Sequence, residues 1–310
     1  CSNKRSDKNS RTKKKYNIKT MKDLKTIRGM PDLYDEEVER ISIVEKTCLE
    51  TFKSFNFQEF RTPVIENKSL FQRSVGESSD IIQKEVYEFA DRNGETLCLR
   101  PEGTAGLVRA LITNGLMNDE IKKFFYLGPM FRYERPQKGR KRQFFQAGAE
   151  LIGEESTKSD VEIISLAKTI LEKLEINYSL EINYLGKDES LNSYRAYLRK
   201  YLQNFKDDFE DKVYSRLQRN PLRAIDSKDS KIKKIFEDAK DISAFLTNDE
   251  KESFNKTVNS LKELKIKFDI NKQLVRGLDY YTGTVFEFTV DGLGSQNAVV
   301  GGGRYDNLIK

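Results

Sequence analysis

FFYLGPMFRYERPQKGRKRQFFQAGAELIG, residues 124–153, combines two runs rich in aromatic and aliphatic residues with a strongly basic segment between them. The two runs, residues 124–133 and 143–153, have the composition of β-strands, so the stretch predicts two strands joined by a loop. Six cationic side chains fall within eleven residues of this loop and its borders: Arg132, Arg135, Lys138, Arg140, Lys141 and Arg142. They repel one another unless an anion lies between them, and phosphate suits the planar fork of Arg. The stretch therefore predicts a phosphate site, with a solvated basic hairpin as the alternative.

The elements on either side of this stretch set the fold class. Further strands are predicted at residues 57–65, 96–100, 280–290 and 298–300, the last two flanking a turn at residues 291–294. Helices are predicted at residues 36–55, 104–116 and 159–174. Strands thus come in runs rather than in regular alternation with helices. This order favours an α+β fold, with a mixed, largely antiparallel sheet flanked by helices, over a Rossmann-type parallel sheet.

Composition changes along the chain divide it into four parts. Residues 1–20 hold six Lys, two Arg and one Asp with few large apolar groups, and we expect them to be a disordered basic tail. The alternative is that Met21 is the true start. Residues 21–185 and 271–310 are expected to form the core. Residues 186–270 are dense in Lys, Asp and Glu and show helical periodicity around residues 194–205, 232–245 and 254–264, so we expect them to form a helical insertion.

The overall composition excludes several classes of function. The net charge of +6 comes from the tail, so a nucleic-acid surface on the remainder has to be a local patch. The chain has no histidine, which excludes a Ser/His/Asp triad and imidazole metal ligands. Its three cysteines suggest neither a disulfide framework nor a zinc site. No apolar run is long enough to span a membrane and no secretory signal is recognisable, so we expect a cytoplasmic protein.

Two further segments carry residues suited to ligand binding. In RPEGTAG, residues 100–106, a Pro and two Gly residues predict a turn that leads into a helix, with Glu102 and Thr104 at its start. A carboxylate there suits a ligand ammonium group, although a capping role without a ligand is the alternative. The second segment is VRGLDYYTGTVFEF, residues 275–288, followed by GGGRYD at residues 301–306. Its Gly triplet allows a backbone to approach a ligand closely.

Taken together, these segments resemble the class II aminoacyl-tRNA synthetases, and specifically the histidyl-tRNA synthetase family. The resemblance runs from about Thr26 to Lys310. It rests on RPEGTAG (100–106), FRYERPQKGRKRQF (131–144), RNPLRAIDSKDSK (219–231) and RGLDYYTGTVFE (276–287). RTPVIE, residues 61–66, resembles motif 1, which builds the dimer interface in this family. The resemblance implies a homodimeric aminoacyl-tRNA ligase that uses ATP, Mg²⁺, histidine and tRNA(His).

The resemblance also implies roles for residues around ATP. Arg132 would hold the α-phosphate, while Glu134 and Arg140 would bind the adenine and γ-phosphate ends of the nucleotide. Arg276 would lie between the histidine carboxylate and the α-phosphate, so Arg276 and Arg132 are the expected catalytic residues. Mg²⁺ would bridge the phosphates, and its protein ligands stay open.

Other residues are implied to bind histidine and tRNA. Those expected at the amino group of histidine are Glu102, Thr104 and Gln146. Those expected to recognise or enclose the imidazole are Glu150, Tyr281 and Tyr305. The loop residues expected at the tRNA acceptor end are Arg135, Gln137 and Lys138.

Two departures from the family pattern leave alternatives open. Phe145 stands where the family usually has histidine, and we interpret it as an aromatic packing replacement, with loss of a ligand contact as the alternative. The chain ends at Lys310, before the expected motif 3 and anticodon-binding domain, so we expect it to be a fragment. One alternative function is the histidine-binding regulatory subunit of ATP phosphoribosyltransferase, and another is an inactive RNA-binding or dimerising remnant. Retention of Arg132, Arg140 and Arg276 favours the synthetase.

Overall fold

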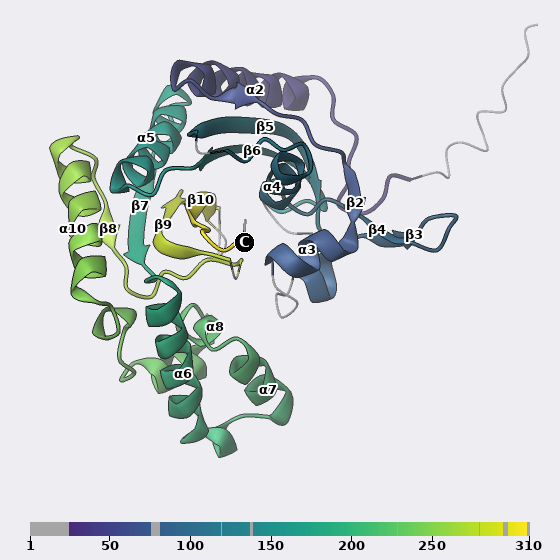
Figure 1. Cartoon of the computed structure of the whole chain (residues 1–310). Coiled ribbons are helices and arrows are strands. Elements are labelled where there is room, and N and C mark those ends of the chain that lie inside the picture. Colours follow the sequence, from purple (N-terminus) through teal and green to yellow (C-terminus); the bar gives the residue numbers. More distant parts are fainter. Residues whose placement is uncertain are drawn as a thin grey trace, which may run out of the picture.

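The computed structural model has an α+β architecture in which helices flank small sheets (Figure 1). It describes residues 25–75, 81–118, 120–136, 139–227, 229–278, 280–293 and 297–308. The predicted basic tail, residues 1–20, lies outside the described residues. Within the described ranges, the strands form three sheets, in which antiparallel pairs predominate. The predicted fold class is confirmed.

The stretch at residues 124–153 forms the predicted pair of strands. β5 and β6 pair antiparallel from Lys122 opposite Ile152 to Phe131 opposite Gln143, and β1 adds a short parallel strand beside β5. Side chains alternate along each strand, so Tyr126 and Glu150 share one face of this sheet while Phe125 lies on the other. The bounds are β1 Gln58–Glu59, β5 Lys122–Phe131 and β6 Gln143–Ile152.

Helices α2 (Glu36–Ser54) and α5 (Thr157–Lys173) confirm two predicted helices and pack against the Phe125 face (Figure 1). Phe52 of α2 stacks on Phe125 with ring centroids 4.8 Å apart. The buried core here comprises Cys48, Phe52, Phe57, Phe125 and Leu166. One face of the β5–β6 pair is therefore closed by apolar packing, and polar groups gather on the other.

A second sheet, in the order β10-β9-β7-β8, lies next to α5 and α10 (Figure 1). β9 pairs antiparallel with both β7 and β10, which confirms the predicted C-terminal hairpin, although Gly294 of its turn lies outside the described residues. Phe286 and Phe288 of β9 are buried against Val258 and Leu261 of α10. The bounds are β7 Ser179–Tyr184, β8 Asp269–Ile270, β9 Thr282–Thr289, β10 Ala298–Arg304 and α10 Asn248–Glu263.

The third sheet, in the order β2-β4-β3, holds the segment that precedes RPEGTAG. The single strand predicted at residues 57–65 is wrong, because β1 and β2 belong to different sheets. Pro63 lies between them; it has no N–H to donate, and it restricts the residue before it, so one continuous ladder is disfavoured. The bounds are β2 Ile65–Asn67, α3 Lys68–Val75, η1 Ile81–Glu85, β3 Glu88–Ala90, β4 Thr96–Leu99 and α4 Thr104–Thr113.

The helices between β7 and α10 lie below the sheets in Figure 1 and pack around a separate apolar core. The single helix expected over residues 232–245 is wrong: α9 ends at Phe236 and a 3₁₀ turn follows. The Asp241 side chain accepts the Ser243 N–H at 2.9 Å, a local bond that competes with helix continuation. The bounds are α6 Asp188–Gln203, η2 Lys206–Asp208, α7 Asp211–Arg219, α8 Leu222–Ile225, α9 Ser230–Phe236 and η3 Ile242–Ala244. No helix in the described part of the chain has the length and apolarity needed to cross a membrane.

Candidate active site

The polar face of the β5–β6 pair is centred on the buried carboxylate of Glu150. Three hydroxyl groups donate to it: Thr104 at 2.7 Å, Tyr305 at 2.5 Å and Tyr126 at 3.4 Å. Tyr126 stands opposite Gly148, and its ring fills the space that a Cβ at position 148 would need. The glycine thus allows a tyrosine to lie flat against β6 and reach the carboxylate.

Burial raises the pKa of Glu150 to about 7, because a charged carboxylate is disfavoured away from water. The hydrogen bonds from Tyr305 and Thr104 act in the opposite direction, and the negative charge of nearby Glu102 raises the pKa further. A carboxyl group that titrates near neutrality inside a cluster of hydroxyl groups is a candidate for recognising a ligand that exchanges protons at similar pH.

Glu102 lies at the N-terminus of α4, as the sequence predicts. Its carboxylate accepts the backbone N–H groups of Thr104 at 2.7 Å and Ala105 at 3.0 Å. Burial raises its pKa, while these bonds and the charge of Arg132 oppose the rise. The capping role is therefore present in the structure, and it also holds Thr104 where its hydroxyl reaches Glu150.

Aromatic rings enclose one side of the cluster. Tyr280 lies 4.7 Å from Tyr281 and 5.8 Å from Tyr305 between ring centroids. Gln146 is two strand positions from Gly148 on the face that carries Glu150. Its side-chain oxygen is buried and, among the described residues, has no hydrogen-bond partner. A buried acceptor of this kind suits a donor supplied by a ligand.

Arg276 forms an ion pair with Glu287 of β9. Its guanidinium lies over Gly301 of β10, where a Cβ would collide with it. Its Nε is buried and has no hydrogen-bond partner within the part of the chain that is described. The guanidinium is thus held by one carboxylate and retains a donor for another group.

Arg132 is held beside the Glu102 loop. Its Nε donates to the carbonyl oxygen of Pro101 at 2.8 Å, and its guanidinium lies 5.2 Å from the ring centroid of Phe144. Glu134 forms an ion pair with Arg140 and lies 3.9 Å from the Arg132 guanidinium. The predicted nucleotide residues Arg132, Glu134 and Arg140 are therefore neighbours. Arg135 is exposed nearby, whereas the predicted tRNA contacts Gln137 and Lys138 lie outside the described residues.

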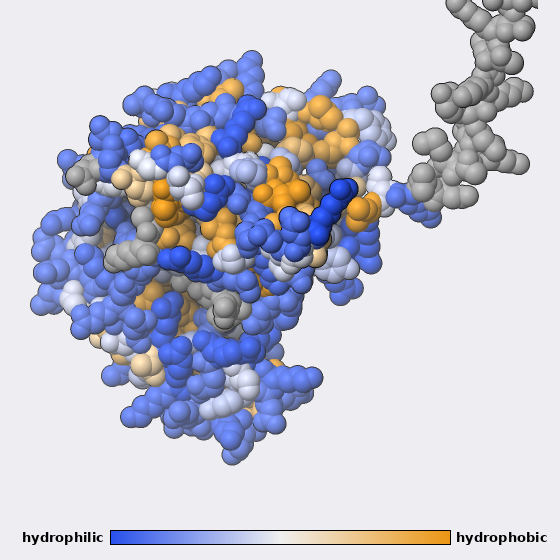
Figure 2. All heavy atoms as spheres, turned by 45° about the vertical axis from the view of Figure 1, so that its right-hand side comes forward, coloured by the Kyte–Doolittle hydropathy of each residue, from blue (hydrophilic) through white to orange (hydrophobic). Residues whose placement is uncertain are grey.

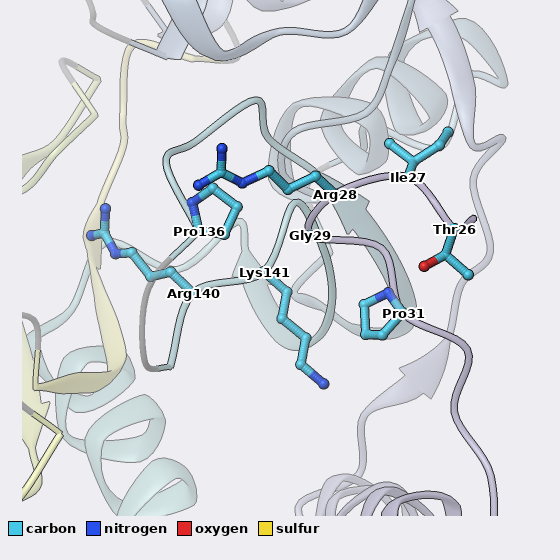
Figure 3. A pocket seen from close by; sticks show the side chains of 8 residues that line it. All are labelled: Thr26, Ile27, Arg28, Gly29, Pro31, Pro136, Arg140 and Lys141. Atoms are coloured by element: carbon cyan, nitrogen blue, oxygen red, sulfur yellow. The ribbon is translucent and has the colours of Figure 1, made fainter. Parts of the chain in front are cut away.

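An open cavity of about 420 Å³ lies between the basic loop and the segment that precedes α2. Figure 3 shows that Arg28, Arg140 and Lys141 surround it from these two segments and point in different directions. The Gly29 carbonyl oxygen accepts the backbone N–H of Arg142 at 2.7 Å and of Gln143 at 3.2 Å. The N-terminal segment thus supports the base of the loop, a role that the sequence analysis missed.

Sequence reasoning also missed Tyr126 and Tyr280 within the cluster, and Glu287, the ion-pair partner of Arg276. Strand alternation could have identified Tyr126, because a hairpin centred on the basic loop puts it on the Glu150 face. Phe145 lies on the opposite strand face from Gln146 and is 43% exposed. Because Phe145 faces away from the cluster, its position does not support the alternative of a lost ligand contact there. Because its ring is exposed, it does not support packing inside this chain either.

Comparison with known proteins gives the family directly. A family model described as Histidyl-tRNA synthetase matches residues 29–310. The chain belongs to the histidyl-tRNA synthetase family. It is 47% identical to a histidine–tRNA ligase of Dictyoglomus turgidum over 285 residues, which cover 91% of this chain and 69% of the relative. It is 46% identical to a histidine–tRNA ligase of Prochlorococcus marinus strain AS9601, with 94% of this chain and 68% of the relative covered.

Solved structures agree with this family assignment. Apo S. aureus histidyl-tRNA synthetase superposes with a TM-score of 0.72 at 32% identity, covering 92% of this chain and 67% of that one. A Bacillus halodurans protein described as an ATP phosphoribosyltransferase regulatory subunit/histidyl-tRNA synthetase gives a TM-score of 0.64 at 22% identity, covering 92% of this chain and 77% of that one. At that identity the second likeness shows only a shared fold. The histidyl-tRNA synthetase fold therefore brings Glu102, Thr104, Glu150 and Tyr305 into one cluster.

Proposed function

We propose that this chain contains the catalytic core of a histidine–tRNA ligase, which activates histidine with ATP and transfers it to the 3′ end of tRNA(His). The observation that carries the proposal is the buried Glu150 carboxylate, which receives hydrogen bonds from Thr104, Tyr126 and Tyr305. It is the acceptor that an imidazole N–H requires. The family assignment and the ligase relatives support the same activity.

Histidine would bind with its imidazole between Glu150 and the tyrosine rings. In its ionised form Glu150 would accept a hydrogen bond from an imidazole N–H, and Tyr281 and Tyr305 would enclose the ring. The amino group would lie toward Gln146, whose buried oxygen is a free acceptor among the described residues, and toward Glu102 and Thr104. A site built to bond a polar side chain rejects analogues that lack it, because its own buried groups would then stay unpaired.

ATP would bind along Arg132, Glu134 and Arg140. A carboxylate oxygen of histidine forms a bond to the α-phosphorus, the bond from this phosphorus to the bridging oxygen breaks, and pyrophosphate leaves. Arg276 and Arg132 would neutralise the charge that develops, since fixed cationic donors in a site that excludes water stabilise it most effectively. In the second step a ribose hydroxyl of the terminal adenosine attacks the carbonyl carbon of the adenylate, and AMP leaves.

The described residues include no group of three or more His, Cys, Asp or Glu side chains that could hold a metal by themselves. Mg²⁺ commonly binds through substrate phosphates with only one or two carboxylates, and keeps several waters. We therefore assign Mg²⁺ to the ATP phosphates and attribute no separate step to it.

We further propose that the protein has the domain division expected from its sequence and a cytoplasmic location. Arg135, Gln137 and Lys138 would contact the acceptor end of tRNA. A homodimer is supported by exposed apolar residues on α2 and around β2, namely Ile43, Val44, Val64 and Ile65. Figure 2 shows apolar side chains gathered in the middle of one face of the molecule, bordered by hydrophilic ones.

The regulatory-subunit alternative fits the site less well. A protein that only senses histidine needs the Glu150 cluster but gains nothing from cationic groups at the nucleotide phosphates. Arg132 and Arg140 flank Glu134, and Arg276 lies at Gly301, so the charged groups expected for ATP chemistry are kept. This retention supports the ligase.

The test is histidine-dependent ATP–pyrophosphate exchange by the protein expressed from its complete coding sequence. Arg276→Ala is expected to lower the exchange about 100- to 1,000-fold, the usual cost of losing one preorganised charge-stabilising donor. Arg216→Ala is the matched control, because Arg216 is an exposed arginine on α7. Histidine binding without exchange in the unsubstituted protein would contradict the proposal and favour the regulatory alternative.

A further inference from the structure

The backbone that carries Arg276 is anchored in the helical part of the chain rather than in the sheet alone. Leu274 and Val275, the two residues before Arg276, are buried in the apolar core that contains Leu222 and Ala224 of α8. Asn183 of β7 donates its side-chain amide to the Leu274 carbonyl oxygen at 3.0 Å. The chain therefore reaches Arg276 from a fixed point at the junction of helices and sheet.

On the other side of Arg276, the side chain of Arg223 on α8 holds the backbone. The Arg223 guanidinium donates to the carbonyl oxygen of Gly277 at 2.5 Å. Arg223 is half-buried, and its neighbours Leu222 and Ala224 are buried, so the short helix has little freedom to move. A charged donor to a carbonyl oxygen is one of the stronger hydrogen bonds in proteins. The residues on both sides of Arg276 are thus held at α8: Val275 by the apolar core that contains Leu222 and Ala224, and Gly277 by the Arg223 hydrogen bond.

Arg276 itself has little room to adjust. Its guanidinium packs over Gly301, where even a Cβ would not fit, and is paired with Glu287. A displacement of its backbone therefore moves the guanidinium with it. Misplacement of a catalytic group by about 1 Å can cost about 100-fold in rate.

We propose that Arg223 is a positioning residue for Arg276: the α8 guanidinium fixes the Gly277 carbonyl and thereby aims the Arg276 guanidinium at the reacting groups. The inference rests on the proposed function and assigns a catalytic purpose to the helical part between β7 and α10. Arg223 touches no substrate in this scheme. It acts only through the backbone next to Arg276.

The experiment uses the protein expressed from its complete coding sequence, with Arg223→Ala, Arg223→Lys and the control Arg216→Ala. ATP–pyrophosphate exchange gives kcat and the KM for histidine, calorimetry gives the Kd for histidine, and thermal unfolding reports stability. Arg223→Ala is expected to lower kcat about 10-fold with the histidine Kd changed less than about twofold, since one lost charged bond is worth about 1.5 kcal/mol. Arg223→Lys, which keeps a cationic donor, is expected to lose less rate than Arg223→Ala. Arg216→Ala is expected to keep the rate of the unsubstituted protein.

A mutant cycle with Arg276→Lys separates positioning from a general structural effect. If Arg223 acts through Arg276, the double variant Arg223→Ala/Arg276→Lys loses less rate than the product of the two single losses. Additive losses, or an exchange rate in Arg223→Ala equal to that of the unsubstituted protein, overturn the inference. A loss of histidine affinity and melting temperature in parallel with kcat overturns it too. Absence of exchange in the unsubstituted protein contradicts the proposed function itself, and the inference with it.

Discussion

Replacing Glu150 by Gln removes the charge at the centre of the polar cluster while keeping the shape of the side chain. The carboxylate accepts bonds from Thr104 at 2.7 Å and Tyr305 at 2.5 Å, and it is the proposed acceptor for the imidazole. A hydrogen bond to a charged group contributes about 1.5–3 kcal/mol. Glu150→Gln is therefore expected to weaken histidine binding about 10- to 100-fold and to leave the KM for ATP within about twofold.

Although Glu150→Gln is expected to weaken histidine binding, it is expected to stabilise the folded protein at high pH, because the pKa of Glu150 is raised on folding. Folding moves the pKa of Glu150 from an ordinary value of 4.5 to about 7. The folded protein keeps a proton that the unfolded chain releases, so stability falls as the pH rises from about 4.5 to 7, and the full cost is present above 7. That cost is about 3 kcal/mol at pH 8. Gln does not titrate, so the variant avoids it.

The assay is thermal unfolding of both proteins from pH 5 to pH 8, paired with calorimetric titration of histidine at pH 8. The melting temperature of Glu150→Gln relative to the unsubstituted protein is expected to increase with pH over this range. Any cost of placing an amide beside the hydroxyl groups is independent of pH and cancels in this comparison. A melting-temperature difference that stays constant with pH would contradict the raised pKa of Glu150, and an unchanged histidine Kd would contradict its role as the imidazole acceptor.

Three further substitutions test the Tyr305–Glu150 bond, the N-terminal segment and a buried ion pair. Tyr305→Phe removes a donor that lowers the pKa of Glu150, so the midpoint of the pH dependence of histidine binding, measured by calorimetry, is expected to move upward; an unmoved midpoint contradicts the Tyr305–Glu150 bond. Gly29→Ala puts a Cβ 2.8 Å from Arg142 Cγ at a residue with a φ of +84°, so it is expected to displace the basic loop and raise the KM for ATP about fivefold. An unchanged KM would show that the N-terminal segment does not influence ATP binding. Arg304→Ala leaves the buried Asp160 carboxylate without its 2.7 Å ion pair and is expected to lower the free energy of unfolding, measured by chemical denaturation, by about 3–5 kcal/mol. Adding Asp160→Asn is expected to recover part of this loss. No recovery would show that the unpaired Asp160 charge is not its cause.

The sequence predicted the fold where periodicity and local composition agree. The β5–β6 pair follows from two aromatic runs around a basic loop, and α2 and α5 follow from apolar residues at helical spacing. Prediction failed where a local bond or a proline overrides the pattern. Pro63 splits the strand expected over residues 57–65, and Asp241 starts a new turn where one long helix was expected.

The site shows a different limit of sequence reasoning. Thr104 and Glu150 are 46 residues apart and Tyr305 is 155 residues beyond Glu150, so only the family resemblance could group them. Contacts to which the resemblance assigns no role, such as Tyr126 over Gly148 and Glu287 beside Arg276, depend on which residues of paired strands lie opposite each other. Register is determined by the packing of whole sheets, which spacing in the sequence does not reveal.

The histidine specificity of the site is tested most directly by ATP–pyrophosphate exchange, using the protein from its complete coding sequence with each of the common amino acids supplied in turn. Glu150, held by Thr104, Tyr126 and Tyr305, is proposed as an acceptor for an imidazole N–H. Histidine alone is expected to support exchange above background. Exchange supported equally by another amino acid, or by none, would contradict this expectation.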